Sequence, residues 1–184
     1  RTNTDRYRVG RAGFDAGLLN GEFENITATQ GTSDYYAYQE GIYTFRNPEA
    51  VNINVLATPG IDYSENNSLV GLTIDMVEEE RADSVYILTS PEGVTYNNVV
   101  QLTSIGFSTV STFSADDMIG LLEAADIDSN YTATYWPWIQ SKDTENNVNV
   151  WLPPTYEVVR NIALTDNVSF PWFASAGYTR GLTS

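Results

Sequence analysis

The chain contains no cysteine and no histidine. The first absence excludes disulfides, thiol nucleophiles and zinc sites with thiolate ligands. The second removes the commonest general base and the commonest metal ligand, so a Ser-His-Asp triad cannot form within the chain. We therefore expect neither a catalytic residue nor a cofactor or metal site.

Basic residues are also scarce, with nine Lys and Arg against 24 Asp and Glu and a net charge of −15. Four of the nine, Arg1, Arg6, Arg8 and Arg11, lie in the first eleven positions. Without these four and Asp5, five basic and 23 acidic residues remain, a net charge of −18. Such a body repels nucleic acid and anionic membranes. The basic stretch is either a solvated tail or a contact with an acidic surface of a neighbouring copy.

Long apolar runs are missing too. No stretch of about 18 apolar residues is present, so we expect no membrane span. No secretory leader is visible, and a chain that starts at Arg1 and stops at Ser184 is expected to be a fragment of a longer protein. The length, 42 % hydrophobic residues and 12 % aromatic residues suit one α/β or α+β domain.

Residues 1–33 carry five glycines and are predicted to be an irregular N-terminal segment, followed by a folded domain over 34–184. Ser33 and Asp34 can cap a helix that runs to Phe45. This helix places four residues at helical spacing, which predicts a core-facing stripe: Tyr35, Tyr38, Ile42 and Phe45.

A strand–helix–strand unit follows. Residues 51–57 alternate and then run apolar, which predicts a strand that ends in a turn at 58–60. Residues 68–82 predict a helix, and residues 85–89 predict a second buried strand. Short links between them imply a right-handed crossover and a parallel pair. The predicted helix has one apolar face, formed by Leu69, Leu72, Met76 and Val77.

The second half predicts further helices and strands. Residues 94–114 are placed only as a loop with a strand or short helix, and a helix is predicted over 115–125. A strand over 131–139, a polar turn over 141–147 and a strand over 148–152 predict a hairpin. Pro153 and Pro154 can start a helix that runs to about Leu164, closed by residues 165–167.

Candidate sites have plain structural alternatives. Glu78, Glu79 and Glu80 point about 100° apart on a helix, so a solvated face is favoured over an ion site. The four tryptophans either stack sugars or bury area in the domain or at a subunit contact: Trp136, Trp138, Trp151 and Trp172. A carbohydrate-binding module or an acidic glycoside hydrolase domain therefore stays open, although no motif selects a carboxylate pair. Phosphate-binding glycine motifs are absent from the sequence.

The order of motifs over residues 50–181 resembles the conserved central region of contractile-tail sheath proteins of bacteriophages. The shared order begins with two strands, one before Pro59 and Gly60 and one before Ser90 and Pro91. An aromatic-Pro-Trp stretch and a helix that starts with Pro-Pro come next. The order ends with an Ala-Gly…Arg-Gly stretch. The match is densest over residues 131–181. The residues that match the family motifs are Pro59, Gly60, Trp136, Pro137, Trp138, Trp151, Pro153, Pro154, Asp166, Trp172, Gly177, Arg180 and Gly181.

This resemblance implies a layered α/β/α domain with a mixed, partly parallel sheet, a subtilisin-like core without an active site. It implies a structural protein of the virion tail, assembled in the cytoplasm of the host bacterium. Sheath subunits form a helical stack of six-fold rings around the tail tube, and a baseplate signal makes the stack contract. Contraction drives the tube through the host envelope during genome ejection. The implied partners are further copies of the chain, tail tube proteins and baseplate proteins.

The chain departs from the family where the flanking domains that exchange strands between subunits are missing, and helix 154–164 lacks small residues often found there. It would be a divergent member. The sheath of an R-type bacteriocin or of a secretion system is the alternative within the same mechanism. We hypothesise that five arginines form subunit contacts, namely Arg1, Arg6, Arg8, Arg11 and Arg180. We also hypothesise that Trp136, Trp151 and Trp172 anchor the core.

Overall fold

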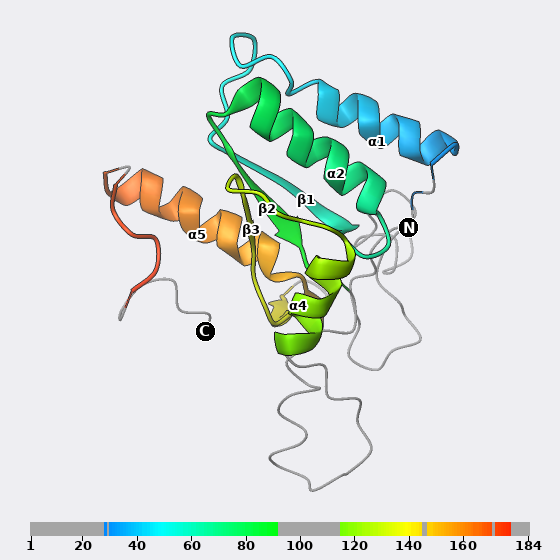
Figure 1. Cartoon of the computed structure of the whole chain (residues 1–184). Helices are drawn as coiled ribbons and strands as arrows, with labels where there is room; N and C mark the ends of the chain where they lie inside the picture. The colour runs from blue at the N-terminus through cyan, green and yellow to red at the C-terminus, as the bar shows by residue number, and fades with distance from the viewer. Residues whose placement is uncertain (1–27, 29, 92–114, 145–146, 171, 178–184) are drawn as a thin grey trace, which may run out of the picture.

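The structure is a computed structural model, and it describes residues 28, 30–91, 115–144, 147–170 and 172–177 (Figure 1). The predicted irregular segment, apart from its last few residues, lies outside this part, and so do residues 94–114 and all five arginines of the predicted contact. Among the described residues, no helix combines the length and apolar character that crossing a membrane requires.

Three parallel strands form the central sheet, in the order β1-β2-β3. They are β1 (Val55–Asp62), β2 (Val85–Thr89) and β3 (Thr132–Thr134). Val55 is level with Val85, and Ile87 is level with Ala133. The predicted parallel pair is confirmed, and the α/β class agrees with this sheet and its helices. Among the described residues every pairing in this sheet is parallel, and not mixed as predicted, because the antiparallel pairing forms a separate two-stranded sheet.

The predicted turn at Pro59 and Gly60 is wrong, because β1 continues through both residues. The register against β2 shifts between Ala57 and Asp62, so the extra residues bulge from the ladder while the strand direction is kept. Gly60 has a φ of +88°, a conformation that glycine adopts without steric cost. Across the irregularity, the Thr89 hydroxyl donates to the Thr58 carbonyl oxygen at 2.9 Å.

The predicted helix over 68–82 is confirmed as α2 (Asn67–Asp75), which continues as one π-helical segment, η2 (Met76–Arg81). Leu69, Met76 and Val77 are buried, as the apolar face required. A π-helix bonds residues five apart, so Met76 and Arg81 turn towards the same side. The segment ends at Ala82, which has a φ of +49°.

Helix α1 (Ser33–Tyr43) packs on α2 (Figure 1). Tyr35 and Ile42 are buried, and Tyr38 and Phe45 pack against the same core, as the stripe predicted. The predicted end at Phe45 is wrong, because the helix ends at Tyr43 and Phe45 packs from the loop that follows. The cap is Thr32 and not Ser33 or Asp34, since the Thr32 hydroxyl accepts from the Tyr35 amide at 3.3 Å.

The single strand predicted over 131–139 is wrong. After β3 the chain bends at residues 135–138 and then forms β4 (Ile139–Asp143), which pairs antiparallel with β5 (Val148–Leu152). Two residues explain the break. Pro137 has no amide proton for a ladder, and Trp138 turns inward, is fully buried and donates from Nε1 to the Ser90 carbonyl oxygen at 3.3 Å. The predicted second strand over 148–152 is confirmed and belongs to a hairpin, but the predicted turn over 141–147 is too long, because β4 continues to Asp143.

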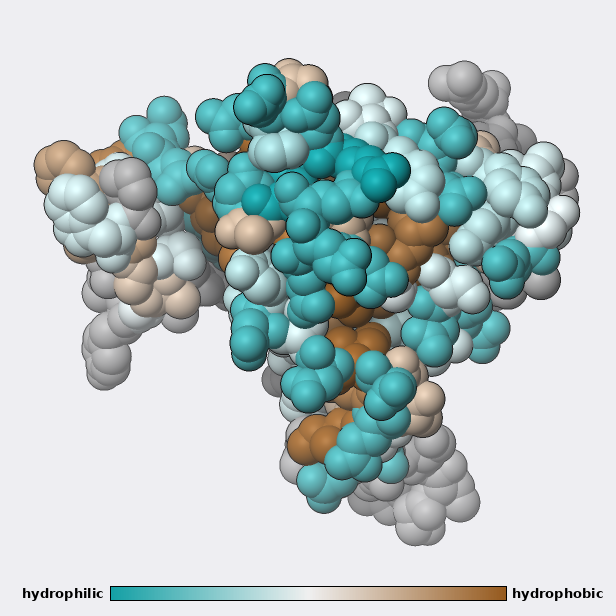
Figure 2. Space-filling view, turned by 45° about the horizontal axis from the view of Figure 1, so that its top comes forward, coloured by the Kyte–Doolittle hydropathy of each residue, from teal (hydrophilic) through white to brown (hydrophobic). Residues whose placement is uncertain are grey.

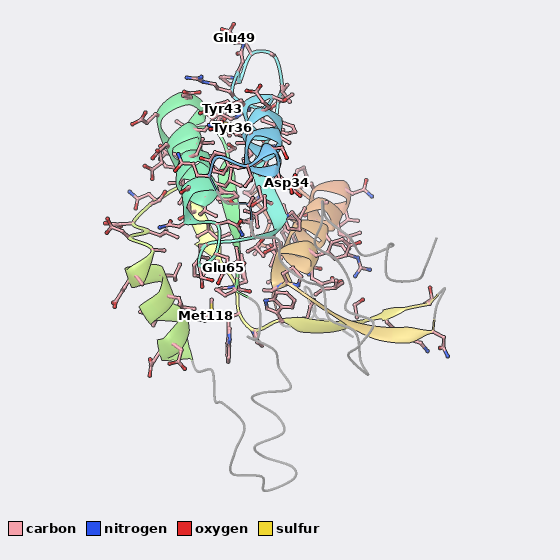
Figure 3. The ribbon with its side chains drawn as sticks, turned by 90° about the vertical axis from the view of Figure 1, so that its right-hand side faces the viewer. Asp34, Tyr36, Tyr43, Glu49, Glu65 and Met118 are labelled. Carbon is pink, nitrogen blue, oxygen red and sulfur yellow. The ribbon has the colours of Figure 1, made fainter. Side chains whose placement is uncertain are left out.

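Helix α5 (Pro154–Val168) starts where the proline pair predicted, but it runs past Leu164 through residues 165–167. The polar residues there do not close it, because the Thr165 hydroxyl bonds back to the Asn161 carbonyl oxygen at 2.9 Å within the helix. In Figure 3 the β4–β5 hairpin extends away from α1 and α2, on the side of α5.

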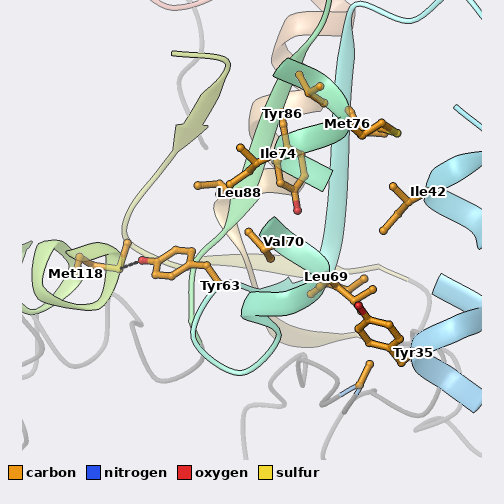
Figure 4. Packing of buried hydrophobic residues seen from close by; sticks show 14 of the residues in the cluster. Tyr35, Ile42, Tyr63, Leu69, Val70, Ile74, Met76, Tyr86, Leu88 and Met118 are labelled. Carbon is orange, nitrogen blue, oxygen red and sulfur yellow. Dashed lines mark hydrogen bonds between the residues drawn. The ribbon is translucent and has the colours of Figure 1, made fainter. Parts of the chain in front are cut away.

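Helices α2 and α5 cover opposite faces of the sheet (Figures 1 and 4). Tyr86 and Leu88 of β2 join the core cluster with α2, whereas Ile87 points to the other face. On that face the Thr155 hydroxyl lies 3.3 Å from the Leu88 carbonyl oxygen. Described elements are therefore layered as helices, sheet and helix. Helix α4 (Ala115–Ala124) joins the end of the core.

Two tyrosines of the apolar core, Tyr63 and Tyr86, use their hydroxyl groups in contacts between elements. The Tyr63 hydroxyl donates to the Met118 sulfur of α4 at 3.1 Å (Figure 4). Burial raises the pKa of Tyr86 to about 12, and hydrogen bonds between its hydroxyl and the side chains of Thr58 and Thr73 oppose that rise. The Thr58 oxygen lies 2.6 Å from the Tyr86 oxygen. Tyr86 therefore joins β2 to β1 and α2, and Tyr63 joins the end of β1 to α4.

Arg81 ties the loop between α1 and β1 to the helix layer. Its buried guanidinium forms a two-bonded pair with Asp83 at 3.0 and 3.1 Å. Its Nη1 also donates to the carbonyl oxygens of Phe45, at 2.6 Å, and Val51, at 3.0 Å. The loop carries Glu49 at its tip (Figure 3). One side chain thus satisfies four acceptor atoms of three residues.

We expect Arg81→Met to lower the free energy of unfolding by about 3 kcal/mol, because it leaves a carboxylate and two carbonyl groups without their donor. Arg81→Lys should recover only part of this loss, since an ammonium group cannot reproduce the planar fork. Thermal and urea unfolding measure the change. Arg160→Met is the matched control, because Arg160 pairs with Glu157 at an exposed position and should matter little. An Arg81→Met protein as stable as the control would contradict this role.

Candidate interaction surfaces on helix α5

The carboxyl edge of the parallel sheet is the usual ligand position in α/β folds. Here its polar groups hold the fold. Asp62 is 1 % exposed, and its Oδ1 accepts from the amides of Ser64 and Glu65 and from the Ser64 hydroxyl at 2.8–2.9 Å. The Thr89 hydroxyl is used by β1, and the buried ring of Trp138 lies at the end of β2. The described part of this edge is therefore occupied by the protein's own side chains.

The acidic run on η2 behaves as a helix surface. Glu79 is exposed, and Glu80 pairs with Arg46, whose guanidinium lies 5.4 Å from the centre of the Tyr43 ring. Within residues 30–91 and the other described ranges, no group of three or more possible ligands gathers to hold a metal ion. The exposure of Glu79 agrees with the prediction that this run forms a solvated helix face.

The residues that matched the family motifs divide into two groups. Those nearer the sheet are structural: Pro59 and Gly60 lie within β1, Trp136 packs against the core, and Pro153 and Pro154 are buried at the start of α5. Pro137 follows a cis peptide bond, and Trp138 is fully buried. This group lies around the sheet and the first turn of α5.

The second group lies near or beyond the end of α5. Asp166, Trp172 and Gly177 are exposed, and Trp172 is 80 % exposed. The expectation that Trp172 anchors the core is therefore wrong. Trp151 pairs through its backbone with Gln140, and its side chain lies outside the described part, as do Arg180 and Gly181. Sequence alone could not separate Trp138 from Trp172, because both follow a proline.

An apolar groove of about 470 Å³ lies between β1 and α5. Apolar side chains dominate its wall, and the exposed Arg160 lies at its rim. Edge strand β1 supplies one wall, the start of α5 supplies another, and the Arg81-held loop supplies the third. The lining residues are Phe45, Ile53, Val55, Leu56, Ala57, Pro59, Thr155, Tyr156, Val159 and Arg160.

Exposed apolar side chains continue from the groove along α5. Tyr156, Leu164 and Val168 are each at least half exposed, and at about 100° per residue they fall within an arc of about 120° on the helix surface. Beyond the helix, the Phe170 and Trp172 rings stack at 4.8 Å with an interplanar angle of 1°. We call these two rings the aromatic pair. In Figure 2 the projecting left-hand end, where α5 finishes, carries hydrophobic atoms at its surface.

These surfaces were not predicted from the sequence. The four-residue spacing of Tyr156, Leu164 and Val168 was a usable signal, but it ran beyond the predicted end of the helix. The groove depends on the contact between α5 and β1, which no local pattern gives.

Comparison with known proteins gave no relative. No protein-family model matches the chain, and no curated protein or solved structure is significantly similar to it.

We expect Trp172→Ala to change the free energy of unfolding by less than about 0.5 kcal/mol, because the ring is exposed. Trp138→Ala, the matched substitution at a buried ring, should cost about 3–5 kcal/mol. Urea unfolding measures both. A large loss of stability in Trp172→Ala would place this ring in the folded domain and remove it from the interaction surface.

Proposed function

We propose that the chain is a structural subunit of a bacteriophage contractile tail sheath. In this role, copies polymerise as a helical stack around the tail tube, and contraction of the stack drives the tube through the host envelope. The chain then acts in the virion tail, with tube and baseplate proteins as partners and without chemistry of its own.

The observation that carries this proposal is the exposure of apolar side chains where the family resemblance is densest. In the described part of the chain, seven of the ten exposed large hydrophobic residues fall within residues 131–181. They are Tyr135, Tyr156, Leu164, Val168, Phe170, Trp172 and Phe173. Exposed apolar patches mark sites where proteins associate. The motif region thus combines buried residues, Trp138 and Pro153 to Thr155, with uncovered apolar side chains along and beyond α5, as a repeated subunit needs.

The remaining architecture suits a mechanical role. Contraction requires nearly rigid domains that pack in two arrangements. Arg81 and the buried start of α5 fix the groove walls to the sheet, so the surfaces on α5 are held by a rigid body. We further propose that the three parallel strands belong to the layered, subtilisin-like core that the resemblance implies. The same argument applies to the sheath of an R-type bacteriocin or of a secretion system, which contracts in the same way but differs in its cargo.

One observation favours a second function, carbohydrate binding. The aromatic pair offers a flat, exposed ring, and Trp172 is 80 % exposed. Exposed tryptophan rings are enriched at binding sites because they combine a large apolar face with a polar nitrogen. Binding of soluble oligosaccharides that is lost in Trp172→Ala would support this function.

Electron microscopy tests the sheath proposal. The chain should be expressed together with any sequence that its gene encodes on either side, purified, concentrated and imaged by negative stain. We expect regular, hollow, striated tubes, since heterologous contacts that do not close propagate a helix. Monodisperse particles at high concentration would contradict the proposal, and glycan binding by the same particles would favour the alternative.

A further inference from the structure

We infer that the aromatic pair of one copy docks in the groove between β1 and α5 of a second copy. This inference rests on the proposed self-assembling function and identifies the surfaces that make the contact. The two surfaces belong to the same chain, are both apolar, and lie at opposite ends of one helix.

The groove and the pair match in chemistry and size. The groove holds about 470 Å³ and is lined largely by apolar side chains, among them Ile53, Val55 and Val159. Phe170 and Trp172 already stack, so they can enter it as one preformed unit at little further entropic cost. Two aromatic side chains bury roughly 300–500 Å² together. A standard interface uses about 800 Å² from each partner, and the exposed Leu164, Val168 and Phe173 beside the pair can supply the rest.

The pair does not lie in the groove of its own chain, because neither Phe170 nor Trp172 is among the groove's lining residues. On α5 the lining runs from Thr155 to Arg160 and the helix ends at Val168, so eight to thirteen residue steps, about 12–20 Å, separate the groove from the end of the helix. In Figure 1 the segment after α5 lies at the far end of the helix from the sheet. The occupant must therefore come from another copy, placed so that the end of its α5 meets the first turns of the next α5.

Charge favours the same arrangement. The chain carries a net charge of −15, so two copies repel unless cations lie at the contact. Arg160 is at the groove rim with its side chain 62 % exposed, where it pairs with Glu157 of its own helix at 3.0 Å. Asp166 is exposed in the last turn of α5, two residues before its end. Docking the pair brings Asp166 of one copy towards Arg160 of the next. Opposite charges at the rim set the register of the contact.

The contact is heterologous, because it joins two different surfaces. Each copy that offers its pair to one neighbour still has its groove open to another, so assembly continues beyond a dimer. A symmetric contact between two aromatic pairs would instead stop at two copies.

Complementing variants test this inference. The pair variant, Phe170→Ser with Trp172→Ser, keeps the groove, and the groove variant, Val159→Trp with Tyr156→Lys, keeps the pair. We expect each variant alone to associate at least about tenfold more weakly than the unmodified chain, because aromatic anchors dominate interface energies. An equimolar mixture should form a one-to-one heterodimer and nothing larger, measured by sedimentation velocity. Ile119→Ser, at a similarly exposed apolar residue of α4, should assemble like the unmodified chain.

Cysteine cross-linking gives a second measurement, because the chain has no cysteine. A chain with both Tyr156→Cys and Trp172→Cys should give a ladder of disulfide-linked multimers on mild oxidation. We expect no internal closure, since twelve residue steps of helix, about 18 Å, separate Tyr156 from Val168 at the end of α5, and a disulfide needs Cα atoms closer than about 7 Å. Moving the second cysteine to Ile119→Cys should abolish the ladder.

The outcomes separate the inference from the sheath proposal. Restored pairing in the mixture with a 156–172 ladder supports the inference. A groove variant that assembles like the unmodified chain overturns it, even if tubes form, because the pair then docks elsewhere. Absence of tubes and of any self-association overturns both. A pair variant that assembles normally but loses oligosaccharide binding assigns the aromatic pair to a glycan.

Discussion

The seating of α5 on the parallel sheet is the constraint on which the other features depend. Pro153, Pro154 and Thr155 are buried, and the Thr155 hydroxyl reaches the Leu88 carbonyl oxygen of the central strand. This first turn closes the sheet face opposite α2 and creates the groove beside β1. Because a helix is stiff, it also determines where the other end of α5 lies. The groove therefore lies at the buried start of α5, and the aromatic pair lies beyond its other end.

The rest of the fold keeps that base rigid. The register shift in β1 at Gly60, the buried ring of Trp138 and the four bonds of Arg81 each use a polar or irregular feature to fix the sheet edge or the groove wall. In the described part of the carboxyl edge, these features leave no reactive side chain exposed to a ligand. A subunit that works by rearranging contacts between rigid surfaces needs a sheet edge and groove wall that are held in this way.

Local patterns in the sequence predicted much of the fold. The apolar spacing gave the helices around residues 33–43 and 67–81, the Pro-Pro pair gave the start of α5, and the polar turn gave the hairpin. Predictions failed where a distant contact overrides the local pattern. Gly60 permits a bulge that only the pairing with β2 demands, and Trp138 breaks a strand because Ser90 and the core accept it.

The interaction surfaces were the least predictable part. The exposure of a side chain on α5 depends on which face of the helix the sheet covers. Composition does not distinguish a buried tryptophan from an exposed one. Trp138 and Trp172 illustrate this, since one is fully buried and the other is 80 % exposed. The sequence-based contact of arginines falls outside the described residues and stays a prediction.

Self-association is the central claim, and sedimentation velocity of the unmodified chain over a wide range of concentrations tests it most directly. The account predicts that the weight-average sedimentation coefficient rises with concentration without reaching the plateau of a closed dimer. A coefficient that stays at the monomer value throughout would contradict it.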